Sequence, residues 1–132
     1  MKKSLINGVS DVVVEAIDGM LSIDSSISRV GDFNSIVRSD IIDYRNKHVT
    51  VISGGGSGHE PLHAGFVGAG MLSGAVCGNV FASPSVASIL ATIRVCAGPK
   101  GVLVVVKNYT GNHYLFHHHL FHYHYHYHQV ID

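Results

Sequence analysis

Apolar residues near the amino-terminus of the chain recur with the spacing of a helix face. Positions i, i+3, i+4 and i+7 are apolar at Val9, Val12, Val13, Ala16, Ile17, Met20 and Leu21. This pattern predicts an amphipathic helix with Ser10 as its N-cap and Gly19 as a weak point. The polar segment 25–40 has no long period, so we expect loops there, with room for one short helix or strand.

Three runs of apolar and β-branched residues predict strands in the middle of the chain, at 47–53, 74–81 and 101–108. Between the last two runs, Ser83 as a cap and Pro84 in a first turn predict a helix that stops at Gly98. Continuous apolar strands joined by helical crossovers are typical of parallel sheets. We therefore predict an α/β fold with a parallel-sheet layer and flanking helices.

The composition limits the size, partners and location of the protein. A chain of 132 residues holds one small domain, and zero formal net charge with 14% charged residues gives no attraction to nucleic acid or anionic lipid. No apolar run is long enough to span a membrane, and Asp11, Glu15 and Asp18 interrupt what a signal peptide would keep apolar. Cys77 and Cys96 lack C-x-x-C spacing, so we predict reduced packing residues. These features predict a cytoplasmic protein that binds a small molecule or another protein.

The stretch 53–63, SGGGSGHEPLH, brings glycines together with chemically active residues. A P-loop needs lysine after its last glycine, and the dinucleotide fingerprint and the nucleophile elbow need glycine where His59 stands, so all three motifs fail. The segment His59–His63 does match H-E-x-x-H, in which one helix presents two zinc ligands and Glu60 acts as base. Pro61 argues against this zinc hydrolase interpretation, because proline fits only the first turn of a helix.

Two other interpretations of this stretch stay open. Glycines expose backbone N–H groups to a small ligand, and His59 at a helix start could bond a hydroxyl group or act as acid or base. The alternative is a tight turn with a structural histidine. In parallel sheets ligands bind at the carboxyl ends of strands, and Lys107 lies at the end of the third predicted strand.

Longer stretches carry information beyond these short motifs. They are the block SGGGSGHEPLHAGFVGAGMLSGAVCGNVFASPS (53–85), the strand end GVLVVVKNYTG and the opening MKKSLINGVSDVVVEAIDGM. Together, over residues 1–111, they closely resemble the substrate-binding part of the dihydroxyacetone (glycerone) kinase family. The resemblance implies a parallel α/β fold, a homodimer, and phosphoryl transfer from ATP, with magnesium, to dihydroxyacetone or glyceraldehyde. The amino-acid sequence of this strand end favours the ATP-using branch of the family over the phosphotransfer-system branch.

The resemblance also implies roles for particular residues. The family's G-S-G-H segment lines the substrate pocket, and it corresponds here to Gly56, Ser57, Gly58 and His59. The lysine of the KNYTG strand end contacts substrate, and that position is Lys107. His59 suits proton transfer at the hydroxyl that attacks phosphorus. Without the resemblance, Lys107 would be interpreted as a surface lysine at a strand end.

The chain departs from the family pattern at Asn112. The family has an aspartate there that helps to activate the substrate hydroxyl, and an amide cannot usefully accept a proton. The family also binds the ketone covalently on a histidine further along the chain, and its nucleotide site lies on a separate domain. We therefore predict that residues 1–111 are a truncated fragment of a larger substrate domain, inactive alone. The alternatives are a non-catalytic fragment that binds a triose or a protein partner and, third, the zinc hydrolase.

Residues 112–132 differ from the rest in composition. Eight of the 11 histidines lie between 113 and 128, where there is no Lys, Arg, Asp or Glu. We expect this low-complexity tail to be disordered, or to be translated intron, because Gly111-Asn112 can be encoded with the form of a splice donor. Sequencing the transcript across codon 111 tests that hypothesis. The functional alternative is loose metal binding by alternate histidines, and we predict no specific metal site.

Overall fold

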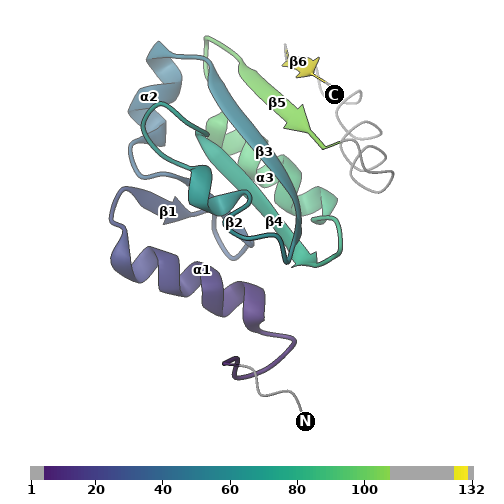
Figure 1. Cartoon of the computed structure of the whole chain (residues 1–132). Helices are drawn as coiled ribbons and strands as arrows, with labels where there is room; N and C mark the ends of the chain where they lie inside the picture. The colour runs from purple at the N-terminus through teal and green to yellow at the C-terminus, as the bar shows by residue number, and fades with distance from the viewer. Residues whose placement is uncertain (1–4, 108–126, 131–132) are drawn as a thin grey trace.

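A six-stranded sheet with the order β1-β2-β4-β3-β5-β6 forms the centre of the protein (Figure 1). This computed structural model describes residues 5–107 and 127–130. The strands are β1 (Ile27–Arg29), β2 (Ser35–Arg38), β3 (Thr50–Ser57), β4 (Gly74–Val80), β5 (Val102–Val106) and β6 (Tyr127–Val130). The helices are α1 (Val12–Ile23), α2 (Ile41–Lys47), α3 (Val86–Cys96) and the short 3-10 helix η1 (Ala64–Phe66).

The strand directions confirm the predicted α/β class and add an antiparallel edge. Strands β4, β3, β5 and β6 are parallel neighbours, whereas β2 pairs antiparallel with β4, and β1 pairs antiparallel with β2 at the edge of the sheet. The segment 25–40 therefore forms two strands, where the sequence predicted loops with at most one short helix or strand. Strands of three and four residues are too short to show an alternating pattern, and they are fixed by pairing with distant residues such as Ala75, opposite Ile36.

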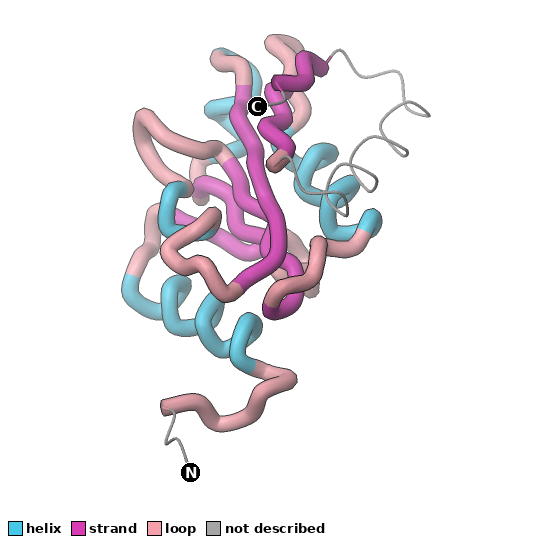
Figure 2. Tube along the Cα trace, turned by 45° about the vertical axis from the view of Figure 1, so that its right-hand side comes forward, coloured by secondary structure: helices cyan, strands magenta, loops and turns pink. Residues whose placement is uncertain are grey.

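Helices cover both faces of the sheet, as Figure 2 shows. Side chains alternate across a strand, so Val76 faces the layer of α2 and α3, while Ala75 and Cys77 face α1 and η1. The larger core includes Ile52, Ile89, Ile93, Val102, Val104 and Cys96; the smaller includes Val13, Ile17, Ile36 and Val67. Both cysteines are free and buried, which confirms their prediction as reduced packing residues.

Several predicted boundaries move by a few residues. Helix α3 begins after Ser85, whose hydroxyl accepts a hydrogen bond from the Ser88 N–H at 3.2 Å, so the predicted cap at Ser83 is wrong. Helix α1 begins after Asp11 instead of Ser10. Helix α2 was not predicted, because its seven residues are too few to show a helical period.

The carboxyl-terminal region is described only in part. Tyr127–Val130 forms β6 and pairs in parallel with β5. Residues 108–126 and 131–132, including Asn112, lie outside the described residues, so the division at residue 111 stays a prediction. Within the described part, no helix has the length and apolar character needed to cross a membrane.

Candidate functional site

The carboxyl ends of β3, β4 and β5 meet at one edge of the sheet, because these three strands are parallel neighbours. The segment that follows β3 lies between the ends of the other two. Lys107 directly follows β5, and Phe81 directly follows β4. This edge therefore holds both the predicted residues at 56–59 and Lys107.

The glycine run lies inside β3 rather than in a loop after it. Gly54 pairs with Val76 of β4, and an added Cβ at Gly54 would collide with the Val76 carbonyl oxygen. The strand register also shifts between Gly55 and Ser57. The missing Cβ at Gly54 therefore allows β3 and β4 to approach closely, and it does not make room for a ligand there.

The end of β3 supports the loop that follows β4. The Ser57 hydroxyl donates a hydrogen bond to the Gly78 carbonyl at 2.7 Å, and the Phe81 N–H donates to the Ser57 carbonyl at 2.8 Å. A Cβ on Gly56 would lie 2.9 Å from the Ala82 nitrogen. The backbone of 78–82 therefore rests directly on Gly56 and Ser57, with no room for larger residues.

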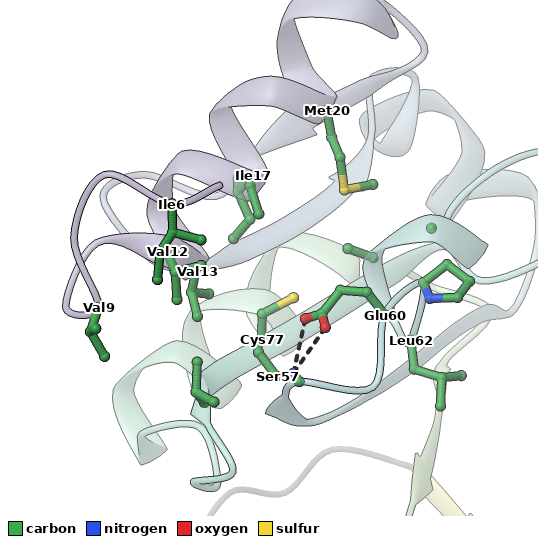
Figure 3. Close-up of a pocket in the computed structure, with 16 residues that line it drawn as sticks. Ile6, Val9, Val12, Val13, Ile17, Met20, Ser57, Glu60, Leu62 and Cys77 are labelled. Carbon is green, nitrogen blue, oxygen red and sulfur yellow. Dashed lines mark hydrogen bonds between the residues drawn. The ribbon is translucent and has the colours of Figure 1, made fainter. Parts of the chain in front are cut away.

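The segment 58–63 is a turn, not the start of a helix as predicted. Gly58 has φ +109°, which only glycine adopts readily, and its N–H donates to both Glu60 carboxylate oxygens at 3.0 Å (Figure 3). The following helix, η1, begins at Ala64 and has only three residues. The Glu60 carboxylate therefore already accepts the hydrogen bond that the Gly58 N–H would otherwise offer to a ligand.

The zinc interpretation needs both histidines of H-E-x-x-H on one helix, and the turn does not provide this. His59 is exposed, whereas His63 is buried ahead of η1. Among the described residues, no three His, Cys, Asp or Glu side chains are grouped so that they could hold a metal ion. Pro61, the residue that weakened this interpretation in the sequence, lies within the turn.

His59 contacts one aromatic neighbour. Its ring centroid lies 5.5 Å from that of Phe81, and the two ring planes are nearly perpendicular at 89°. The same Phe81 ring lies against Gly58, where a Cβ would be 2.9 Å from Cε1. No short motif in the sequence pointed to Phe81, which lies 22 residues from His59, directly after β4.

His63 links the turn to the end of β5. Burial, and next the positive charge of Lys107, lower the pKa of His63 from 6.5 to about 4. The imidazole is therefore neutral at neutral pH, and the ammonium of Lys107 is near enough to influence it. The sequence suggested only a zinc-ligand role for His63, since an electrostatic influence between residues 44 positions apart leaves no local signal.

A pocket of about 730 Å³ lies between α1 and the turn, on one side of the predicted residues (Figure 3). Its lining is largely apolar and includes Ile6, Val9, Val12, Ile17, Leu62 and Val80, with Ser57, Gly58 and Glu60 at one wall. His59 and Lys107 do not line it. Such a lining suits an apolar group better than a small polyol, so we do not place the predicted substrate there.

Cys77 also lines this pocket but is not a candidate nucleophile. Burial, and next the negative charge of Glu60, raise the pKa of its thiol to about 11. The thiol therefore stays protonated at neutral pH, and thiolate is the reactive form. Its role in the described structure is packing between β4 and α1.

Of the predicted site residues, the structure groups five at the same edge of the sheet. Gly56, Ser57, Gly58 and His59 are contiguous at the end of β3, and Lys107 follows the neighbouring strand. The sixth, Asn112, lies outside the described residues. The resulting surface offers a histidine ring, a lysine ammonium and a tight backbone turn, which together can bind a small ligand rich in hydroxyl and carbonyl oxygens.

Comparisons with known proteins agree with one another. A family model described as the Dak1 domain matches residues 18–120. The human protein named triokinase/FMN cyclase is 45% identical over 112 residues, a match covering 83% of this chain and 19% of that protein. The dihydroxyacetone kinase of Citrobacter freundii is 45% identical over 118 residues, covering 85% of this chain and 21% of that protein.

Solved structures show the same similarity. The crystal structure of the native C. freundii dihydroxyacetone kinase matches with a TM-score of 0.88 and 40% identity, covering 99% of this chain and 25% of that chain. The complex of that kinase with AMP-PNP and Mg²⁺ also gives a TM-score of 0.88. The dihydroxyacetone kinase operon co-activator DhaQ matches with a TM-score of 0.82 and 31% identity, covering 89% of this chain and 36% of that chain. The chain thus spans about a fifth of the length of the curated relatives it matches.

Proposed function

Because the chain belongs to the Dak1 domain family, we propose that it binds a triose, dihydroxyacetone or glyceraldehyde, where β3, β4 and β5 end. The observation that carries this proposal is the position of His59. It lies on a turn at the carboxyl end of β3, and Lys107 follows the neighbouring strand β5. Similarity to a protein named dihydroxyacetone kinase supports the choice of ligand.

The residues have distinct roles in this proposal. Gly56, Ser57 and Gly58 hold the turn against the backbone after β4. His59 hydrogen-bonds a hydroxyl group of the triose and can accept its proton, because it is exposed to the ligand on this edge. Lys107 donates a hydrogen bond to a second triose oxygen, while the buried neutral His63 adds no positive charge beside it.

We do not place a nucleotide on this chain. The glycine run lies in the β3 ladder, and the described residues group no set of ligands suited to a metal ion. The glycine run therefore does not form a phosphate-binding loop, and, as the family resemblance implies, we assign ATP with Mg²⁺ to a separate domain or subunit. The family reaction would be phosphoryl transfer to the bound triose. With Asn112 at the family's aspartate position, we expect the chain alone to bind triose without phosphorylating it.

Replacing His59 by alanine tests the proposed site. We expect the dissociation constant for dihydroxyacetone, measured by NMR titration of the full chain, to rise about tenfold, because one strong hydrogen bond is lost. His48→Ala is the matched control, since His48 is an exposed histidine stacked on Tyr44, next to α2. Equal affinities of the parent chain and of His59→Ala would refute the assignment of His59.

A second candidate function is that of a non-catalytic protein that binds a triose or a protein partner. It is favoured by the similarity to a solved protein named as a co-activator and not as a kinase, together with Asn112. Formation of a phosphorylated triose when ATP and Mg²⁺ are added to the chain saturated with dihydroxyacetone would favour the kinase instead.

A homodimer, which the family implies, stays a prediction in both cases. So does a cytoplasmic location, which suits two free buried thiols.

A further inference from the structure

Phe81 adopts a backbone conformation that its side chain does not favour. Its φ is +53°, in the left-handed region that bulky residues rarely occupy, and no other described residue except glycine has positive φ. Apolar burial does not explain this choice, because the side chain is 75% exposed. Such strain persists only where neighbouring contacts hold it, and it is often found beside functional sites.

Two contacts hold Phe81 against the turn after β3. Its N–H donates a 2.8 Å hydrogen bond to the Ser57 carbonyl, so its backbone is fixed to the end of β3. Its ring lies so close to Gly58 that a Cβ there would come within 2.9 Å of Cε1. The ring is thereby directed toward the residue that follows Gly58.

That residue is His59, whose ring meets the Phe81 ring edge to face at 5.5 Å. We propose that Phe81 is a positioning residue that fixes the orientation of the His59 ring at the triose site. The inference rests on the proposed function and adds a residue that the family resemblance did not supply. An exposed imidazole on a turn would otherwise sample several rotamers, whereas the contact with the perpendicular ring favours one of them.

Substitution at Phe81 can separate the ring from the backbone conformation. Phe81→Asn removes the ring but keeps a residue that tolerates positive φ, so the fold is expected to be at least as stable as before. Phe81→Tyr keeps the ring and serves as the rescue variant. A purely structural role for Phe81 would change the unfolding midpoint and leave the His59 ring as it is.

The experiment uses proton NMR on the full chain, with the His59 signals assigned by their loss in His59→Gln. In the parent chain and in Phe81→Tyr we expect nuclear Overhauser effects between the rings at 59 and 81 and ring-current shifts of the His59 protons. In Phe81→Asn we expect those shifts to vanish while the His48 signals stay unchanged. The dissociation constant for dihydroxyacetone is expected to rise about two- to tenfold in Phe81→Asn, which corresponds to the loss of one aromatic pair interaction. In Phe81→Tyr it is expected to return to the value of the parent chain.

The outcomes distinguish this proposal from the proposed function. Identical His59 signals in the parent chain and Phe81→Asn would overturn the positioning role, whether or not the chain binds triose. Changed His59 signals with unchanged dihydroxyacetone affinity would overturn it as well. If the parent chain binds no dihydroxyacetone but the ring effects are present, the triose assignment fails and the fixing of His59 by Phe81 stands.

Discussion

Replacing Gly78 by alanine is expected to lower the free energy of unfolding by about 3 kcal/mol. Gly78 lies in β4, where an added Cβ would collide with the Ala82 carbonyl oxygen and lie 2.7 Å from the Pro84 nitrogen. Both are backbone atoms, so no side chain can rotate away to make room. The backbone from Gly78 into the loop would have to move off the end of β3, which breaks the hydrogen bonds of Ser57 to the Gly78 carbonyl and the Phe81 N–H.

The matched control is Gly19→Ala, at the glycine predicted as the weak point of the first helix. Gly19 lies inside α1 and has no atom within 4 Å of the Cβ position, so alanine is expected to raise stability by about 0.5 to 1 kcal/mol. Urea unfolding followed by circular dichroism measures both variants. A Gly78→Ala midpoint equal to that of the parent chain would show that the loop is not held as the structure describes.

The long elements of the fold could be predicted from the sequence, because each has a local pattern. Continuous apolar runs predicted β4 and β5, and helical spacing predicted α1 and α3. The short elements β1, β2 and α2 could not be predicted in this way. Their stability comes from partners distant in sequence, such as the pairing of β2 with β4.

The family was predicted correctly, and the Dak1 match confirms it. The local geometry of the glycine-rich stretch was predicted less well. Glycines are typical of loops, yet Gly54 lies in a strand, because β3 and β4 approach too closely there for any side chain. A helix start was expected at His59, yet Glu60 binds the Gly58 N–H and closes a turn. Both results depend on atoms that meet only in the folded chain.

The contacts around the candidate site were beyond sequence patterns for the same reason. Phe81, after β4, meets His59, after β3, and His63 lies near enough to Lys107, after β5, to be influenced by its charge. A resemblance to a family names residues but not the neighbours that orient them. What the structure adds to the predicted site is therefore mainly the neighbouring residues, such as Phe81 beside His59.

His63 is expected to make the folded chain less stable as the pH falls from 7 to 4. Its pKa is about 4 in the folded chain and near 6.5 when exposed, so the unfolded chain binds more protons between these values. The stability contributed by the neutral imidazole is therefore complete above pH 6.5 and is lost as the pH falls through 4. We expect a loss of about 2 kcal/mol, below the full linkage value, because solvent still screens part of the ring.

Comparison with His63→Gln isolates this contribution. The free energy of unfolding, measured in urea at pH values from 7 to 4, should fall less steeply in the variant, which has no imidazole to protonate. Carboxyl groups such as Asp40 have a lowered pKa in both proteins and cancel in the difference. His48→Gln, at an exposed ring, should keep the steep slope of the parent chain. If His63→Gln keeps that slope too, His63 is not the buried neutral group beside Lys107, and the electrostatic link between the turn and the end of β5 is lost.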